Sequence, residues 1–264
     1  MIVQKFGGTS LADLEGFLAS ARVVRHFSGE EQVVAVFSAV AGVTDLLVAA
    51  IDAAVAGEDF SAFLNQALEK EQAVLDSIKT EGTKAALAEV NLEEQARHLK
   101  TRLEGVRLLG NCPDEVRAEI LSSGEGFSSR LMADLLAEQG TRVRWSDTDV
   151  LPPANDSWLD SLVDIEAAGK ELHAALSEDI QVLVLPGFYS RNSAGACQLL
   201  GRNGSDYSAA AAAAALKARA CQIWKDVDGF FTADPRIVPN ARCLDEVSFE
   251  EAMELSFFGA KVIS

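Results

Sequence analysis

The sequence predicts an α/β fold, a three-layer sandwich in which a mostly parallel central sheet has helices on both sides. Two observations predict it. Strand-like runs alternate with segments of helical spacing from the first residue onward, and the run at 32–38 is apolar almost throughout, as in strands buried on both faces. A chain of 264 residues is long enough for one large domain of this class or two small ones, and we expect one domain over residues 1–264.

Strands and helices alternate in the first part of the chain, where apolar residues recur either in short runs or at intervals of three and four. The expected elements are a strand at 1–6, a turn at 7–10, a helix over 11–24, a strand at 32–38, a small-residue loop at 39–45 and a helix at 46–56.

The segment 59–109 breaks this alternation. It is rich in Glu, Lys, Gln and Leu and poor in residues that favour strands, so we expect a helical subdomain that projects from the sheet. Its run of charges is typical of a solvated helix face, and a mobile lid over the active site is the functional alternative.

The second half returns to the alternation and adds a hairpin. The expected elements are a helix over 123–139 stopped by Gly140, a strand at 141–146, a loop at 151–161, a buried strand at 180–186, a hairpin around 190–195, a helix after Gly204 with Ser205 as N-cap, a strand at 220–224 and a last helix over 249–258. Ser248 and Glu251 match a capping box for that helix. Residues 260–263 are expected to turn into another strand.

Composition excludes several classes of protein. The formal net charge of −17 opposes binding to nucleic acid or to anionic lipid. No apolar run is long enough to span a membrane, and no charged segment precedes the first strand, so we expect no secretory signal. The four cysteines are widely scattered, which predicts reduced thiols and a cytoplasmic location.

The turn at the N-terminus reads Lys5-Phe6-Gly7-Gly8-Thr9-Ser10. Backbone N–H groups in such a turn can converge on phosphate oxygens, with the helix dipole behind them and the charge of Lys5 beside them. A plain strand-to-helix turn with a surface lysine explains the same residues. The turn is not a P-loop, because no Gly-Lys-Ser/Thr follows the glycines.

Two other loops have the same character. Ser38 and Thr44 flank a small-residue loop that follows a buried strand, where parallel sheets bind ligands, although either hydroxyl could simply cap the next helix. Glu125 lies between glycines in a Ser-Ser-Gly-Glu-Gly turn. Its carboxylate suits a substrate ammonium group, or it is an ordinary acidic residue in the first turn of a helix.

The most specific motif is Gly201-Arg202-Asn203-Gly204-Ser205-Asp206-Tyr207. Arg202 can form a bidentate pair with a carboxylate, and Asn203-Gly204 suits a left-handed or tight turn. Asp206 can orient a catalytic lysine or accept a proton. The alternative is a helix cap with a surface arginine.

A last cluster follows the strand at 220–224 and runs from Lys225 to Arg236. An aromatic such as Phe231 can flank an adenine, and Arg236 can reach phosphates. The paired carboxylates of Asp226 and Asp228 suggest a magnesium site. We rank that interpretation low and assign no metal ligand, since Mg²⁺ bonds mainly to phosphates and water.

Taken together, these motifs resemble those of aspartate kinases within the amino-acid kinase (carbamate-kinase-like) fold. The shared elements are Lys-Phe-Gly-Gly-Thr-Ser, Gly-Arg-Asn-Gly-Ser-Asp-Tyr, Trp-x-Asp-Val-Asp-Gly with Asp-Pro-Arg, and Phe-Gly-Ala-Lys-Val, in order across nearly the whole chain. The chain looks most similar to the kinase portion of bifunctional aspartokinase–homoserine dehydrogenases.

This resemblance implies that ATP, with Mg²⁺, phosphorylates L-aspartate to 4-phospho-L-aspartate, the entry step to lysine, threonine, methionine and, in some bacteria, ectoine. Lys5 would stabilise the transferring phosphoryl group and Asp206 would hold the catalytic lysines. The implied substrate pocket comprises Thr44, Glu125, Arg202, Asn203, Gly204 and Ser205. The implied nucleotide side comprises Lys5, Gly7, Gly8, Ser10, Ser38, Lys225, Asp226, Phe231, Arg236, Lys261 and Val262.

The chain departs from the family pattern at two nucleotide-side positions. Lys225 stands where a small hydroxyl residue is usual, and Phe231 where tyrosine is usual, so ATP affinity is expected to differ while the chemistry survives. Relatives usually continue past this point with final strands and ACT regulatory domains, which we expect this chain to lack. A homodimer is the assembly that we consider.

Two alternatives stay open from the sequence. One is another amino-acid kinase, acting on glutamate or an acylated amino acid, and the other is a non-catalytic ligand-binding or partner subunit. The kinase interpretation requires Lys5 and Arg202 to face each other across a single cleft.

Overall fold

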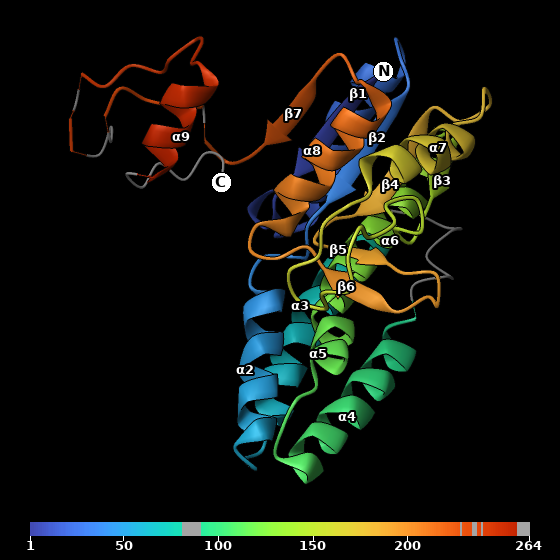
Figure 1. The fold of residues 1–264 in the computed structure, drawn as a ribbon, viewed down its shortest axis with the longest axis vertical. Helices are drawn as coiled ribbons and strands as arrows, with labels where there is room; N and C mark the ends of the chain where they lie inside the picture. The colour runs from blue at the N-terminus through green and yellow to red at the C-terminus, as the bar shows by residue number, and fades with distance from the viewer. Residues whose placement is uncertain (81–90, 228, 234–236, 239, 258–264) are drawn as a thin grey trace.

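The computed structural model describes residues 1–80, 91–227, 229–233, 237–238 and 240–257. Its centre is a five-stranded sheet with the order β3-β4-β2-β1-β7, in which all neighbouring strands are parallel (Figure 1). The strands are β1 (Ile2–Phe6), β2 (Val33–Phe37), β3 (Val143–Trp145), β4 (Val182–Pro186) and β7 (Cys221–Trp224). The predicted α/β class is confirmed.

The pleat of the strands divides the core into two layers of side chains. Phe6 and Phe37 belong to the core on one face, beside the helices α1 (Leu14–Ser28) and α6 (Ser123–Glu138). Val3 and Val36 belong to the other, beside the helices α7 (Ile165–Ala175) and α8 (Gly204–Leu216). Because side chains alternate along a strand, Lys5 points to the same face as Val3, which is the face that α8 covers.

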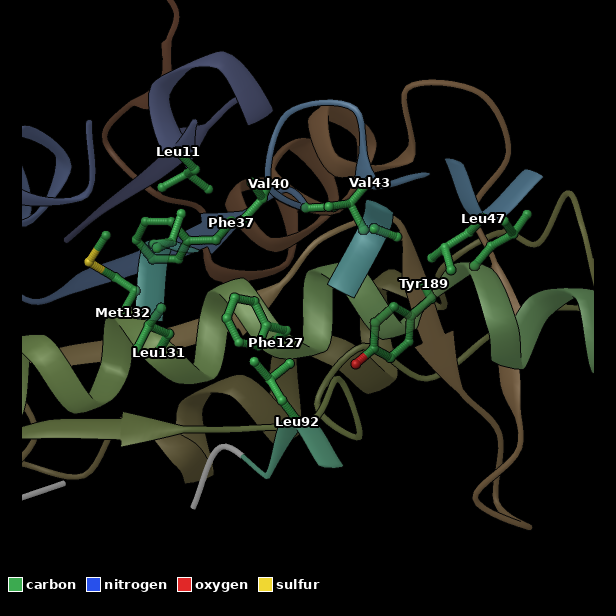
Figure 2. Close-up of a cluster of buried hydrophobic side chains, with 14 of the residues drawn as sticks. Leu11, Phe37, Val40, Val43, Leu47, Leu92, Phe127, Leu131, Met132 and Tyr189 are labelled. Carbon is green, nitrogen blue, oxygen red and sulfur yellow. The ribbon is translucent and has the colours of Figure 1, made fainter. Parts of the chain in front are cut away.

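The core on the α6 face is the larger of the two. Phe37 and Val40 pack with Leu11 against Phe127 and Leu131 of α6 (Figure 2). This packing fixes the N-terminal turn of α6 against the loop that follows β2.

A bundle of helices extends beyond the sheet at one end of the molecule (Figure 1). It consists of α2 (Val43–Val55), α3 (Ser61–Thr80), α4 (Leu92–Leu109) and α5 (Asp114–Leu121). The helices α3 and α4 occupy the described part of the segment 59–109, and 81–90 lie outside the described residues; a separate helical subdomain there stays a prediction. Its role as a lid stays a prediction.

The remaining elements are short. A 3₁₀ turn, η1 (Gly8–Leu11), follows β1, and β5 (Tyr189–Arg191) and β6 (Cys197–Leu199) form the expected antiparallel hairpin. The last helix, α9 (Phe249–Phe257), begins with the expected capping box, in which the backbone N–H of Ser248 donates to Glu251 Oε2 and the backbone N–H of Glu251 donates to Ser248 Oγ. The strand expected at 260–263 lies outside the described residues. Among the described helices, none is long and apolar enough to cross a lipid bilayer.

Candidate active site

The carboxyl ends of three neighbouring strands meet at one edge of the sheet. The backbone N–H of Ser38, after β2, donates to the carbonyl of Phe6 at the end of β1 at 3.1 Å, and the N–H of Gly187, after β4, donates to the carbonyl of Phe37 at 2.8 Å. The loops that carry the predicted motifs therefore start side by side, at the edge where parallel sheets bind ligands.

Glycines allow these loops and two helix N-termini to pack unusually closely. A Cβ atom on Gly8 would lie 2.9 Å from the carbonyl oxygen of Ala39, and one on Gly124 would lie 2.8 Å from the Cβ of the same alanine. A Cβ on Gly187 would lie 2.6 Å from that of Ser205, at the start of α8. Any side chain at these positions would force the loops apart.

Asp206 joins two lysines that come from the ends of neighbouring strands. Its Oδ1 lies 2.7 Å from Nζ of Lys5, on β1, and its Oδ2 lies 3.5 Å from Nζ of Lys225, just after β7. The Lys5 side chain is 8% exposed and that of Asp206 is 15% exposed, so the pair is largely shielded from water. Next to it, Thr9 Oγ1 donates to Asp226 Oδ1 at 3.0 Å, which ties the N-terminal turn to the chain after β7.

The glycine-rich motif around Asp206 forms the N-terminus of α8, with one correction to the prediction. The N-cap is Asn203 and not Ser205, and no side chain caps the helix there. Asn203 adopts the left-handed conformation, with φ 59°, which asparagine tolerates and which turns the chain before Gly204. Ser205 consequently lies in the first helical turn, packed against Gly187.

Arg202 is exposed and lines a pocket of about 940 Å³ together with Asp206, Tyr207 and Met253 of α9. The guanidinium and the Lys5–Asp206 pair thus share one end of α8. Lys5 itself does not line that pocket, so the single cleft that the kinase interpretation requires between Lys5 and Arg202 stays a prediction.

Glu125 lies in the first turn of α6 and is only 4% exposed. Burial raises the pKa of its carboxyl from 4.5 to about 8, against the opposing effects of the backbone amides of Ala39 and Glu125 and of the charge of Lys5. An ordinary acidic residue of a first helical turn is exposed, whereas the burial of this one favours its neutral, protonated form.

One buried residue of this region was missed by the sequence analysis. Glu71, in the middle of α3, is 1% exposed, and burial, followed by the charge of Glu125, raises its pKa well above 4.5. It belongs to the charge run that predicted a solvated face, and Glu69 and Lys70 beside it are indeed exposed. Its spacing does separate it from them, because Glu71 is four residues after Ala67 and three before Val74, which are both buried.

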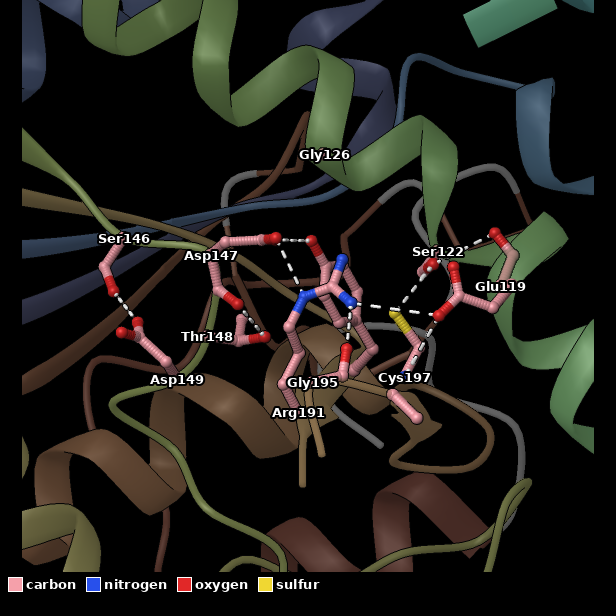
Figure 3. Close-up of polar contacts among 12 residues, drawn as sticks. Glu119, Ser122, Gly126, Ser146, Asp147, Thr148, Asp149, Arg191, Gly195 and Cys197 are labelled. Atoms are coloured by element: carbon pink, nitrogen blue, oxygen red, sulfur yellow. Dashed lines mark hydrogen bonds and ion pairs between the residues drawn. The ribbon is translucent and has the colours of Figure 1, made fainter. Parts of the chain in front are cut away.

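A polar network holds the β5–β6 hairpin against α5 and α6 (Figure 3). Asp147 accepts hydrogen bonds from Tyr189 Oη at 2.5 Å and from Arg191 Nε at 2.8 Å. Ser122, at the start of α6, donates to Cys197 Sγ at 3.4 Å. Burial raises the pKa of Cys197 to about 12, so its thiol is structural and unreactive. The network holds the start of α6, which carries Glu125, against the β5–β6 hairpin.

The other predicted site residues fall into three groups. Those brought to the edge of the sheet are Gly7, whose N–H donates to the carbonyl of Trp224 at 3.3 Å, Ser10 at the end of the first turn, Ser38, and Thr44 in the first turn of α2. Phe231 pairs with Cys243 in the segment after β7, which lies to one side of the sheet (Figure 1), and its part in the site stays a prediction. Asp228, Arg236, Lys261 and Val262 lie outside the described residues.

This geometry combines two ammonium groups, a guanidinium, a buried carboxyl and the N-termini of α2, α6 and α8. Helix N-termini and lysines stabilise phosphate oxygens, and a guanidinium suits a carboxylate. The site can therefore hold two anions close together.

Comparison with known proteins agrees with this reading. A model of the amino acid kinase family matches residues 1–264. The chain belongs to the amino acid kinase family. Along its whole length this amino acid kinase is 40% identical to the bifunctional aspartokinase/homoserine dehydrogenase of Haemophilus influenzae, of which it covers 32%. It is 35% identical to lysine-sensitive aspartokinase 3 of Escherichia coli, of which it covers 57%.

A solved structure gives the same result. The crystal structure of Escherichia coli aspartokinase III in complex with aspartate and ADP matches this amino acid kinase with a TM-score of 0.83 at 32% identity, over all of this chain and 57% of that one. The chain thus spans between 32% and 57% of the length of these relatives. The resemblance to aspartokinases that the motifs indicated is confirmed.

Proposed function

We propose that residues 1–264 form a catalytic domain that transfers the γ-phosphoryl group of ATP to the side-chain carboxylate of L-aspartate. The products are ADP and 4-phospho-L-aspartate, and the reaction opens the biosynthesis of the aspartate family of amino acids. The observation that carries the proposal is the bridge from Asp206 to Lys5 and Lys225 at the carboxyl edge of the sheet, beside Arg202 and the buried Glu125.

The chemistry needs no strong base. An oxygen of the aspartate carboxylate attacks the γ-phosphorus, the bond from that phosphorus to the β,γ-bridging oxygen breaks, and ADP leaves with the electron pair. A carboxylate is already ionised at neutral pH, so the obstacle is the repulsion between two anions. Positioning and charge neutralisation are then the whole of catalysis.

The residues divide this work. Lys5, 8% exposed and held by Asp206, lies where a shielded charge stabilises a phosphoryl oxygen strongly. We assign the substrate's ammonium group to Glu125 and one of its carboxylates to Arg202. The turn at Gly7 and Gly8 and the N-terminus of α8 supply backbone N–H groups to the phosphates.

The donors present fit a magnesium ion that arrives with the nucleotide. The described residues contain no group of three or more His, Cys, Asp or Glu side chains able to hold a metal ion, and Asp206 is engaged with its lysines. Mg²⁺ accepts a site made mostly of phosphate oxygens and water, where it neutralises phosphate charge. We further propose a cytoplasmic location, supported by Cys112, Cys197 and Cys221, which are reduced thiols.

The test is an acyl-phosphate trapping assay on the 264-residue chain. With ATP, Mg²⁺ and hydroxylamine, L-aspartate should yield its hydroxamate, and L-glutamate at the same concentration should not. Preference for glutamate or an acylated amino acid would favour another amino-acid kinase. Nucleotide binding without any hydroxamate would favour a non-catalytic subunit and refute the proposal.

A further inference from the structure

A second buried carboxyl lies behind Glu125, in the helix bundle. Glu71 of α3 is 1% exposed, and its Oε2 accepts a hydrogen bond from Gln95 Nε2 of α4 at 3.1 Å. Its other oxygen, Oε1, is fully buried and has no hydrogen-bond partner among the described residues. An oxygen of an ionised carboxylate left in this state would be costly, because nothing replaces the water that it lost.

Glu125 of α6 also has a buried carboxyl oxygen without a hydrogen-bond partner among the residues that the structure describes. It is 4% exposed, and its Oε2 is buried without a hydrogen-bond partner in the described part of the chain. The helices α3 and α6 pack on each other, and the charge of Glu125 acts on the carboxyl of Glu71. The two acids therefore form one buried pair.

The surroundings supply too little positive charge for two carboxylates. From β1 the pair is faced by Lys5, which is already bound to Asp206, and from α4 by the neutral amide of Gln95. The loop after β2 contributes only the backbone amide of Ala39. Lys70, next to Glu71 on α3, is exposed and has its Nζ beside Gly42 at the start of α2.

A proton on one carboxyl satisfies these buried oxygens, because a protonated acid has an O–H group to donate. We propose that Glu71 is a positioning residue for the amino-acid subsite: it remains a neutral carboxylic acid whose hydroxyl is directed toward Glu125, so that Glu125 alone of the two ionises when it receives the substrate's ammonium group. This inference rests on the proposed function for its substrate. The high pKa of Glu71, caused first by burial and then by the charge of Glu125, agrees with it.

The proton on Glu71 links the packing of the helices α3 and α4 to the charge of Glu125 in the substrate site. Ionisation of Glu71 beside an ionised Glu125 would place two like charges between α3 and α6, where water does not reach. Keeping α3 packed on α6 would then cost free energy. A neutral Glu71 instead stabilises the ionised form of Glu125 at the moment when the substrate binds.

The experiment compares Glu71→Gln, which is neutral and still a donor, with Glu71→Met, which is similar in size and cannot donate. Glu69→Gln and Glu69→Met are matched controls, because Glu69 is an exposed acid of the same helix. For each variant, kcat and the KM values for aspartate and ATP are measured in the hydroxamate assay at neutral pH, after circular dichroism has confirmed the fold.

We expect Glu71→Gln to keep the KM for aspartate within about twofold of the unsubstituted chain. Glu71→Met should raise that KM by about tenfold or more, the scale of one hydrogen bond to a charged group, with the KM for ATP unchanged. Equal impairment of the two variants would show that the charge of Glu71 is needed, and an unaltered KM in Glu71→Met would show that the residue does nothing for the substrate. Either result overturns the proposal.

A second measurement needs no substrate. A buried acid whose pKa is raised above 4.5 destabilises the fold progressively as the pH rises above that value, and glutamine does not. The melting temperature of Glu71→Gln minus that of the unsubstituted chain should therefore increase with rising pH, while the same difference for Glu69→Gln should not change. A constant difference would mean that Glu71 is ionised in the fold. A chain that neither binds nor phosphorylates aspartate would remove the proposed function and the positioning role with it, while this pH series would still decide whether Glu71 is neutral.

Discussion

Replacing Asp206 by asparagine removes the charge that holds Lys5 and Lys225 together without changing the size of the side chain. The carboxylate lies 2.7 Å from one ammonium group and 3.5 Å from the other. In Asp206→Asn the two ammonium groups lose their shared counterion and repel each other. Lys5 suffers more, because its side chain is only 8% exposed whereas that of Lys225 is 20% exposed.

The size of the effect follows from burial. Breaking a largely buried ion pair by removing one partner costs about 3–5 kcal/mol, because the remaining charge is left uncompensated. Lys5 can swing partly into solvent, so some of this cost appears as lost positioning rather than as lost stability. At about 1.4 kcal/mol for each factor of ten, a loss of about 3 kcal/mol in the transition state lowers kcat by about 10²-fold.

The assay is aspartyl hydroxamate formation at saturating ATP and aspartate, beside a thermal melt. Asp114→Asn is the control, since Asp114 is an exposed acid in the first turn of another helix, α5. The KM for ATP should stay level or fall, because the site becomes more positive. A kcat within about threefold of the unsubstituted chain would refute the idea that Asp206 positions the lysines.

Three further predictions concern the same site. Lys5→Ala should lower kcat by about 10²-fold or more, the scale of losing one electrostatic stabiliser, and an unchanged kcat in the trapping assay would contradict its role. Arg202→Ala should raise the KM for aspartate by about tenfold or more with little change for ATP, as a lost charged hydrogen-bond pair implies; a rise in the KM for ATP alone would count against it. Glu125→Gln should gain stability relative to the unsubstituted chain as the pH rises from 4.5 to about 8, because the raised pKa makes the native state retain a proton that the unfolded chain releases. Urea unfolding of the ligand-free chain at a series of pH values measures this gain, and a difference independent of pH would show that burial does not raise the pKa of Glu125.

The sheet and its site edge could be predicted because their signals are local. Residues 32–38 form a continuous apolar run, and β2 is buried along its whole length. The glycine pairs at Gly7-Gly8 and around Gly204 mark the ends of strands, where the chain must turn closely. Lys5 was identifiable because its charge stands beside a glycine turn whose backbone N–H groups can converge on phosphate oxygens.

Elements packed through small residues were harder to recognise. The helices α5 and α7 were not identified from the sequence. The buried residues of α7 are Ala168, Leu172 and Ala175, a narrow stripe with two alanines, and α5 has only eight residues. Such helices form because neighbouring elements cover them, which the local pattern does not record.

The two misjudged polar residues have tertiary causes. Ser205 has the chemistry of an N-cap, but the left-handed turn at Asn203 starts the helix earlier. Glu71 is buried only because α3 and α4 close over it against α6. Its spacing in the helix matches that of the buried Ala67 and Val74, so the pattern held a signal for its burial, while the groups around its carboxyl become visible only when the helices are assembled.

The position of β1 inside the sheet has a consequence for how the chain matures. This strand pairs with β2 on one side and with β7 on the other, and the side chains of Gln4 and Gln222 meet across 218 positions. During translation, the backbone N–H and C=O groups on one edge of β1 therefore have no strand to pair with until the ribosome has released residues 221–224. Pairings of such long sequence separation form slowly, so the contact of Lys5 with Lys225 through Asp206 is among the last to be made. A nascent chain halted before β7 carries an open strand edge and no working site, which makes it a natural client for chaperones.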